Sequence, residues 1–181
     1  MIIKPLPPNV QQLLAATGSP PRLTAHLTLV HDAAQSLTER IHAAWPDVAF
    51  DREAVLFGAA THDIGKVVYP LEMQRPGDAH EEAGVWLLQQ HGVAENLARF
   101  ARTHGQWNDE SAKLEYMLVA LADKVWKGKR EDLLEQAVAD LIAARSGEAV
   151  WKVWLQVDDI LSDVAAFADE RLSFQAGHPV Q

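Results

Sequence analysis

The sequence predicts an all-α fold, a compact bundle of about seven helices, and two observations favour this class. Apolar residues recur at steps of three and four along most of the chain, which is the period of a helix with one buried face. Almost no segment alternates apolar and polar residues with a period of two, so we expect no sheet. With 181 residues the chain is long enough for a sizeable core, and residues 1–181 are expected to form a single domain.

Three helices are expected in the first third of the chain. A short helix stops at Gly18, and a second restarts at Ser19-Pro20-Pro21, where a capping hydroxyl precedes proline at the first helical position. This second helix extends to about Ala44. Its apolar stripe consists of Leu23, Leu27, Val30, Ala34, Leu37 and Ile41. Asp51 is expected to cap the third helix, which ends at His62-Asp63.

The remaining helices follow a loop at 69–77. Asp78 and Glu81 have the spacing of a capping box, in which two side chains cap one helix start reciprocally, and that helix is expected to end at His91-Gly92. Further helices are expected over 93–103 and from Leu114 to near Gly128. Two last helices, over 131–145 and 148–172, complete the bundle.

Composition and charge exclude several classes of protein. No apolar run approaches the roughly 18 residues of a membrane span, and the N-terminus has no secretory leader pattern, so a cytoplasmic location is expected. A net charge of −9 argues against a large nucleic-acid surface or a membrane surface as partner, because both require a basic field. Without cysteine, any metal must be bound by histidine and carboxylate.

An imidazole and a carboxylate stand side by side in Thr61-His62-Asp63-Ile64-Gly65-Lys66, where the third helix ends. Two polar residues at the end of an apolar run are costly to bury unless something compensates them, and a divalent cation does so. The alternative interpretation is an exposed helix end, with Gly65 as its C-terminal stop. The choice depends on whether the rest of the chain supplies more ligands.

Four further residues are candidate ligands. His26 lies on the apolar side of its helix, where a hydrogen-bonded core histidine is the alternative. His80 falls in the first turn of a helix, where the dipole disfavours imidazolium and keeps the ring neutral for metal binding. His104 ends an apolar helical face, either as a cap contact or as a ligand. Asp123 lies on a face with little else polar, where a buried carboxylate usually has a cation as partner.

The other polar residues have simpler interpretations. His31 and His42 are expected at the surface, and His91 is expected as a cation at a helix C-terminus. The basic residues that follow Asp123 fit either a solvated helix end or a phosphate-binding cluster, and Lys66 has the same two interpretations. Those basic residues are Lys124, Lys127, Lys129 and Arg130.

The order of these residues along the chain resembles the HD superfamily of metal-dependent phosphohydrolases. His26-Leu27-Thr28-Leu29-Val30 is similar to the pattern of that family's first helix, and Thr61-His62-Asp63-Ile64-Gly65-Lys66 to its signature doublet. His80-Glu81-Glu82-Ala83-Gly84 resembles the next histidine segment, and Ala122-Asp123-Lys124 the final aspartate segment. The resemblance covers roughly residues 20–130, and the helices over 131–172 complete the bundle outside it.

The resemblance implies a site and a reaction. His26, His62, Asp63 and Asp123 would form the basic metal site, and His80 and His104 match the extra ligands of members that bind two metals, with Asp63 bridging. The implied activity is hydrolysis of a small phosphorylated substrate, with a nucleotide as the favoured class. Asp63 and Lys66 are the implied catalytic residues, and the proposed substrate contacts are Lys66, Arg75, Lys124 and Lys127. One or two divalent ions are implied, from among Mn, Fe, Co, Ni, Mg and Zn.

Two other functions are compatible with the same ligand set. One is a di-iron oxygenase, because some HD-domain proteins with this set have that activity. The other is a non-catalytic module that uses the metal cluster to bind a phosphorylated signal. Two interpretations fit Trp126, Trp151 and Trp154. They either form the surface of a homodimer or pack the last helix onto the bundle.

Overall fold

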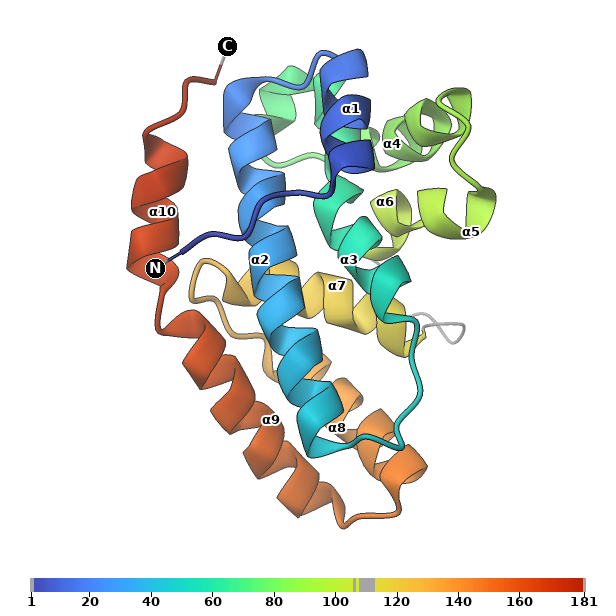
Figure 1. Cartoon of the computed structure of the whole chain (residues 1–181), viewed down its shortest axis with the longest axis vertical. Coiled ribbons are helices and arrows are strands. Elements are labelled where there is room, and N and C mark those ends of the chain that lie inside the picture. Colours follow the sequence, from blue (N-terminus) through green and yellow to red (C-terminus); the bar gives the residue numbers. More distant parts are fainter. Residues whose placement is uncertain (1, 106, 108–112, 181) are drawn as a thin grey trace.

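The structure, a computed structural model, describes residues 2–105, 107 and 113–180, and within them it is entirely helical (Figure 1). The expected all-α class is therefore confirmed, although the described residues form ten α-helices and two short 3₁₀ helices, more than the seven expected. The elements are α1 (Pro8–Ala16), α2 (Pro21–Ala44), α3 (Arg52–Thr61), η1 (Ile64–Val67), η2 (Pro70–Met73), α4 (Ala79–Gln90), α5 (Glu95–Ala98), α6 (Phe100–Thr103), α7 (Leu114–Val125), α8 (Asp132–Ser146), α9 (Val150–Ala165) and α10 (Ala168–Ala176).

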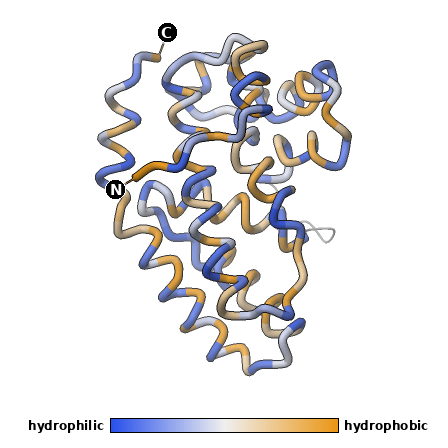
Figure 2. Tube along the Cα trace, in the orientation of Figure 1, coloured by the Kyte–Doolittle hydropathy of each residue, from blue (hydrophilic) through white to orange (hydrophobic). Residues whose placement is uncertain are grey.

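Helix α2 is the central element of the bundle. It packs against α3, α7, α9 and α10 (Figure 1), and its residues from Leu29 to Ile41 belong to the main core together with α7, α8 and α9. A second apolar cluster, which includes Leu23 and Ile64, lies between α1, the start of α2 and α4. Helices at the edge of the bundle carry hydrophobic and hydrophilic residues within each turn, as α9 does in Figure 2. The helical period read from the sequence is thus the period of burial.

Some helix starts follow the predicted chemistry and others do not. Asp51 caps α3 as expected, because its Oδ1 accepts a hydrogen bond from the Ala54 amide at 2.9 Å. The predicted capping box of Asp78 and Glu81 is wrong, since the Asp78 side chain makes no capping bond. The carboxylate of Glu72, in the preceding 3₁₀ helix, accepts the first amides of α4 instead.

Two of the expected helices are each divided. The segment 93–103 forms α5 and α6, and the segment 148–172 bends between α9 and α10 at Ala166 and Phe167. Arg171 explains how the second bend is stabilised: its buried guanidinium donates to the carbonyl oxygen of Val164, which the end of α9 leaves free. Beyond the bend α10 continues onward from the end of α9 and packs along α2 (Figure 1).

The predictions for the tryptophans and for His31 of α2 have mixed outcomes. His31 was expected at the surface but is buried, whereas Trp151 and Trp154 of α9 are exposed and Trp126 is buried. The possible homodimer stays a prediction. Among the described residues, no helix is long and apolar enough to cross a membrane.

Candidate metal centre

The His62-Asp63 doublet lies where α3 passes directly into η1. His62 follows the last residue of α3, its amide donates to the Gly58 carbonyl, and its side chain is fully buried. The expectation that Gly65 is the stop of this helix is wrong, because α3 already ends at Thr61 and Gly65 lies within η1 with a φ that is not positive. A Cβ at Gly65 would instead overlap the carbonyl oxygen of His80. Glycine is required here because η1 and the first turn of α4 are in direct backbone contact.

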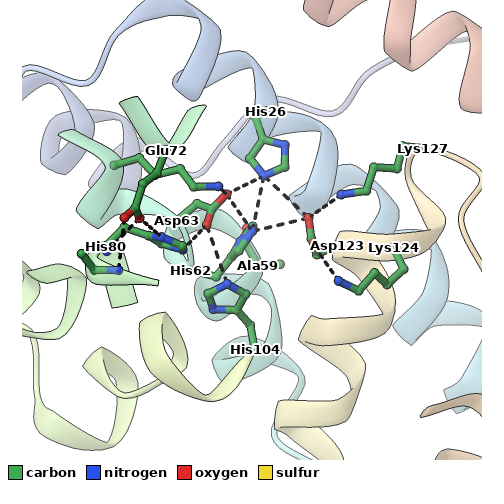
Figure 3. Close-up of polar contacts among 12 residues, drawn as sticks. His26, Ala59, His62, Asp63, Glu72, His80, His104, Asp123, Lys124 and Lys127 are labelled. Carbon is green, nitrogen blue, oxygen red and sulfur yellow. Dashed lines mark hydrogen bonds and ion pairs between the residues drawn. The ribbon is translucent and has the colours of Figure 1, made fainter. Parts of the chain in front are cut away.

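Four other elements contribute the remaining predicted ligands. His26 comes from α2, His80 from the first turn of α4, His104 from the residue after α6, and Asp123 from the last turn of α7. Figure 3 shows their polar ends directed at the Asp63 carboxylate or at one another. The structure therefore brings together all six residues that the sequence singled out.

The first half of the cluster consists of His26, His62 and Asp123. The His26 and His62 Nε2 atoms are 3.4 Å apart, and each lies 3.7 Å from Oδ1 of Asp123. One ligand atom from each of the three residues lies within 4.8 Å of the others. Three ligands at this spacing can surround one small cation.

The second half consists of Asp63, His80 and His104, whose ligand atoms also lie within 4.8 Å of one another. Oδ1 of Asp63 is 3.0 Å from Nε2 of His80 and 3.7 Å from Nε2 of His104. The other oxygen of Asp63, Oδ2, is 3.1 Å from Nε2 of His26. Asp63 thus faces both halves, one oxygen to each.

Hydrogen bonds behind the rings orient two of the histidines. The Nδ1–H of His62 donates to the Ala59 carbonyl at 3.0 Å, and the Nδ1–H of His80 donates to Oε2 of Glu72 at 2.6 Å. In the neutral rings this leaves both Nε2 lone pairs directed into the cluster, the arrangement typical of metal-binding histidines. Glu72 was missed by the sequence reasoning, because a helix-capping carboxylate eight residues before its partner gives no local signal.

The cluster fits divalent cations better than a hydrogen-bonded core. Nε2 of His80 is buried and, despite its short distance to Asp63, lies outside hydrogen-bond geometry. Nδ1 of His104 is also buried without a hydrogen-bond partner among the described residues. Neutral imidazole lone pairs that face carboxylate oxygens repel them unless a proton or a cation lies between. Nitrogen and oxygen ligands without thiolate suit the metals named above.

Burial and neighbouring charges set the protonation of the ligands. Burial lowers the pKa of His26, and burial together with His62 lowers the pKa of His104 to about 4. Burial raises the pKa of Asp63, but the neighbouring His62, His26, His80 and Lys66 outweigh it, so the pKa lies well below its usual value. These three groups are therefore in their metal-binding, deprotonated forms at neutral pH.

The pKa values of two more ligands, Asp123 and His80, are also shifted by their neighbours. The pKa of Asp123 is also lowered, because the neighbouring His62, with Lys127, outweighs burial. Burial lowers the pKa of His80, but Asp63 and Glu72 outweigh it, so the net pKa is raised. A cation competes with this extra proton at His80.

The cluster forms one wall of a cavity of about 370 Å³. Three of the four predicted substrate contacts, Lys66, Lys124 and Lys127, line it, and each pairs with a carboxylate of the cluster. The fourth, Arg75, is exposed after η2 and lines a separate hollow, so the structure does not bring it to the cavity. The lining residues that the sequence reasoning did not assign to the site include Arg22, Trp126 and Gln175. Nothing in the local sequence distinguishes them.

The family of this chain follows from a comparison with models of known protein families. The family model described as the HD domain matches residues 23–128, which include all six clustered residues. The chain belongs to the HD-domain family. HD domains are helical and generally act as metal-dependent hydrolases of the phosphohydrolase superfamily, and they bind divalent metals. Searches of curated proteins and of solved structures found no match. Helices α8–α10 lie outside the matched part of this HD-domain chain.

Proposed function

We propose that this HD-domain protein is a binuclear metal-dependent phosphohydrolase that cleaves a small phosphorylated molecule. The observation that carries the proposal is the division of six ligands into two groups of three, with Asp63 facing both. In this proposal His26, His62 and Asp123 hold one cation, His80 and His104 hold the second, and Asp63 is shared.

Bound divalent cations would supply an activated water and would polarise the phosphoryl group. The chain's own residues position this chemistry. The Ala59 carbonyl and Glu72 fix the ring orientation of His62 and His80, so the ligand nitrogens are held before any substrate arrives.

Basic residues beside the cluster would bind the phosphate oxygens. Nζ of Lys66 lies 2.5 Å from Oδ2 of Asp63, and Nζ of Lys127 lies 3.3 Å from Oδ1 of Asp123. When cations take over these carboxylates, the ammonium groups can turn to an anionic substrate in the same cavity. Lys124, 3.6 Å from Asp123, would act similarly.

The cavity favours an anionic substrate although the whole chain carries a net charge of −9. Four basic side chains line it, Arg22 and the three lysines, against three acidic ones, Asp63, Glu81 and Asp123. Bound cations would make it more positive still. A nucleotide is the substrate class that we favour, on the resemblance to other HD-domain proteins.

The test is hydrolysis by protein loaded in turn with Mn²⁺, Fe²⁺, Co²⁺, Ni²⁺, Mg²⁺ and Zn²⁺, against a panel of phosphomonoesters and nucleotides. We expect phosphate release with at least one metal in the absence of oxygen, and loss of at least about a thousandfold in rate for Asp63→Ala. The absence of turnover with every metal, for the wild type and Asp63→Ala alike, would reject the proposal. Turnover that requires both iron and oxygen would replace hydrolysis with oxygenation.

A further inference from the structure

One end of the cavity is built from residues that the family match does not include. Arg22 precedes the matched segment by one residue, and Gln175 comes from α10, close to the C-terminus. The C-terminal segment contacts the start of α2 here, since the Arg22 amide donates to the carbonyl oxygen of Pro179 at 3.0 Å.

Arg22 and Trp126 both lie close to His26. Arg22 is four residues before His26 in α2, which places both on one face of the helix about 6 Å apart along its axis. The Trp126 ring meets the His26 ring edge to face, with centroids 5.2 Å apart. Both residues line the cavity. They are thus next to the metal centre without belonging to it.

No carboxylate in the part of the chain that the structure describes pairs with the charge of Arg22. Each of the three lysines that line the cavity pairs with Asp63 or Asp123. Across residues 2–105, 107 and 113–180 no carboxylate forms an ion pair with Arg22, and its buried Nε has no hydrogen-bond acceptor. A buried guanidinium nitrogen without an acceptor is rare in folded proteins and indicates a missing partner.

A second donor in the same wall has the same deficit. Trp126 is only 2% exposed, and its indole Nε1–H is buried without an acceptor among the described residues. Indole nitrogen and guanidinium are donors only, so both require acceptor atoms from a ligand. An oxyanion supplies several hydrogen-bond acceptors, and its negative charge would neutralise the guanidinium of Arg22.

We propose that Arg22 and Trp126 bind a second anionic group of the substrate, distinct from the phosphoryl group held at the metal centre. The inference rests on the proposed function and narrows its substrate class to phosphorylated molecules with another phosphate or a carboxylate. In a nucleotide this second group is a further phosphate. Gln175 lines the same cavity and can donate its amide to the bound molecule.

Calorimetric binding of three non-hydrolysable probes to the Mn²⁺-loaded protein tests this proposal. Propylphosphonate has one anionic group, propane-1,3-bisphosphonate adds a second phosphonate, and 3-phosphonopropanoate adds a carboxylate. We expect the wild type to bind one or both of the probes with two anionic groups roughly tenfold to a hundredfold more tightly than propylphosphonate. The probe with the larger advantage identifies the second group as phosphate-like or as carboxylate.

Matched variants assign that advantage to the two residues. Arg22→Gln should bring the affinity ratio close to one, and Trp126→Phe, which keeps the ring against His26, should reduce it several-fold. Arg40→Gln removes the same charge from an exposed site on the same helix and should keep the wild-type ratio. Arg22→Lys, with thermal melts of every variant, separates loss of the guanidinium from loss of folding.

Three results would overturn the proposal. They are a wild-type ratio near one, an unchanged ratio in Arg22→Gln, and an equal loss of affinity for all three probes in that variant. Because the readout is binding, it is independent of turnover. A protein that hydrolyses nothing but shows the expected ratios would contradict the proposed function and support the second anionic site.

Discussion

At the scale of residues, the site depends on how Asp63 is placed between two groups of nitrogen ligands. Its two oxygens face His26 and His80 from opposite sides, and both histidine nitrogens are held in position by contacts behind or beside the rings. The carboxylate is almost fully buried, which is costly without cations nearby. Substitution of the groups that hydrogen-bond to the ligands therefore tests whether they position the ligands.

Glu72 is the first such group. Its carboxylate accepts both the amide and the Nδ1–H of His80, so its charge fixes the ring and raises the basicity of the metal-facing nitrogen. We expect Glu72→Gln to weaken metal binding by roughly tenfold to a hundredfold, as measured by chelator competition.

The control is Glu82→Gln, on the same helix as His80, whose carboxylate forms an exposed pair with Arg102. Its effect on metal affinity should be negligible, because exposed pairs contribute little. Equal effects of the two substitutions would show that Glu72 does not position His80.

His31 predicts a pH dependence of stability that is separate from the metal centre. Burial lowers the pKa of His31 below 6.5, although the neighbouring Asp32 opposes this shift. As the pH falls through 6.5 the unfolded chain takes up a proton that the folded chain does not, so His31 makes the free energy of unfolding decrease. Above that pH both states are neutral and the contribution vanishes.

Urea unfolding of the wild type and His31→Gln at pH 7 and pH 5 measures this contribution. We expect the wild type to lose more stability than the variant between the two pH values. His42→Gln, at an exposed site of the same helix, should lose as much as the wild type. A parallel pH response of wild type and His31→Gln would contradict the assignment.

At the scale of elements, the doublet is positioned by direct backbone packing of η1 against α4. Gly65 and Gly84 permit this approach, since a Cβ at Gly65 would overlap the His80 carbonyl and one at Gly84 would crowd Ala101. The sequence predicted Gly65 as a helix stop, because a glycine after a helical stretch usually is one. Only the position of α4 reveals its different role.

Helix α10 is attached to the bundle through a buried ion pair. Arg171 donates to Asp32 of α2 at 3.1 Å and to the Val164 carbonyl at 2.6 Å. Arg171→Met leaves the Asp32 carboxylate buried with only the Lys4 amide as a described partner, so we expect a loss of about 3–5 kcal/mol in the free energy of unfolding.

A double variant and a control distinguish this pair from general packing. Adding Asp32→Asn to Arg171→Met should recover part of the loss, because the uncompensated charge is removed. Arg40→Met breaks the exposed pair with Asp163 and should cost less than about 1 kcal/mol. Strictly additive losses for Asp32→Asn and Arg171→Met would show that the two side chains are not coupled.

At the scale of the whole molecule, the sequence predicts local features of the structure but not the contacts between distant segments. The helical class and the six clustered residues could be predicted, because apolar period and ligand chemistry are local properties and the order of ligands resembles one family. The divided helices, burial of His31, and the roles of Glu72 and Arg22 depend on contacts between distant segments. No spacing in the sequence encodes these contacts, as the exposed position of Arg75 also shows.

The cavity is also lined by residues outside the part of the chain that matches the HD-domain model. Residues 23–128 supply the clustered ligands, whereas α10 packs along α2 and adds Gln175 to the cavity wall. The Arg171–Asp32 pair thus links the stability of the C-terminal helix to the shape of the proposed substrate site. Loosening α10 is expected to affect substrate recognition before metal binding.

We expect the six clustered residues to bind two divalent cations per chain. Elemental analysis of protein equilibrated with Mn²⁺ and freed of excess metal measures this number. We predict a ratio of metal to protein approaching two for the wild type and at most one for Asp63→Ala, with both proteins helical by circular dichroism. A folded wild type that retains no metal, or an identical ratio in wild type and Asp63→Ala, would show that these residues do not form two metal sites.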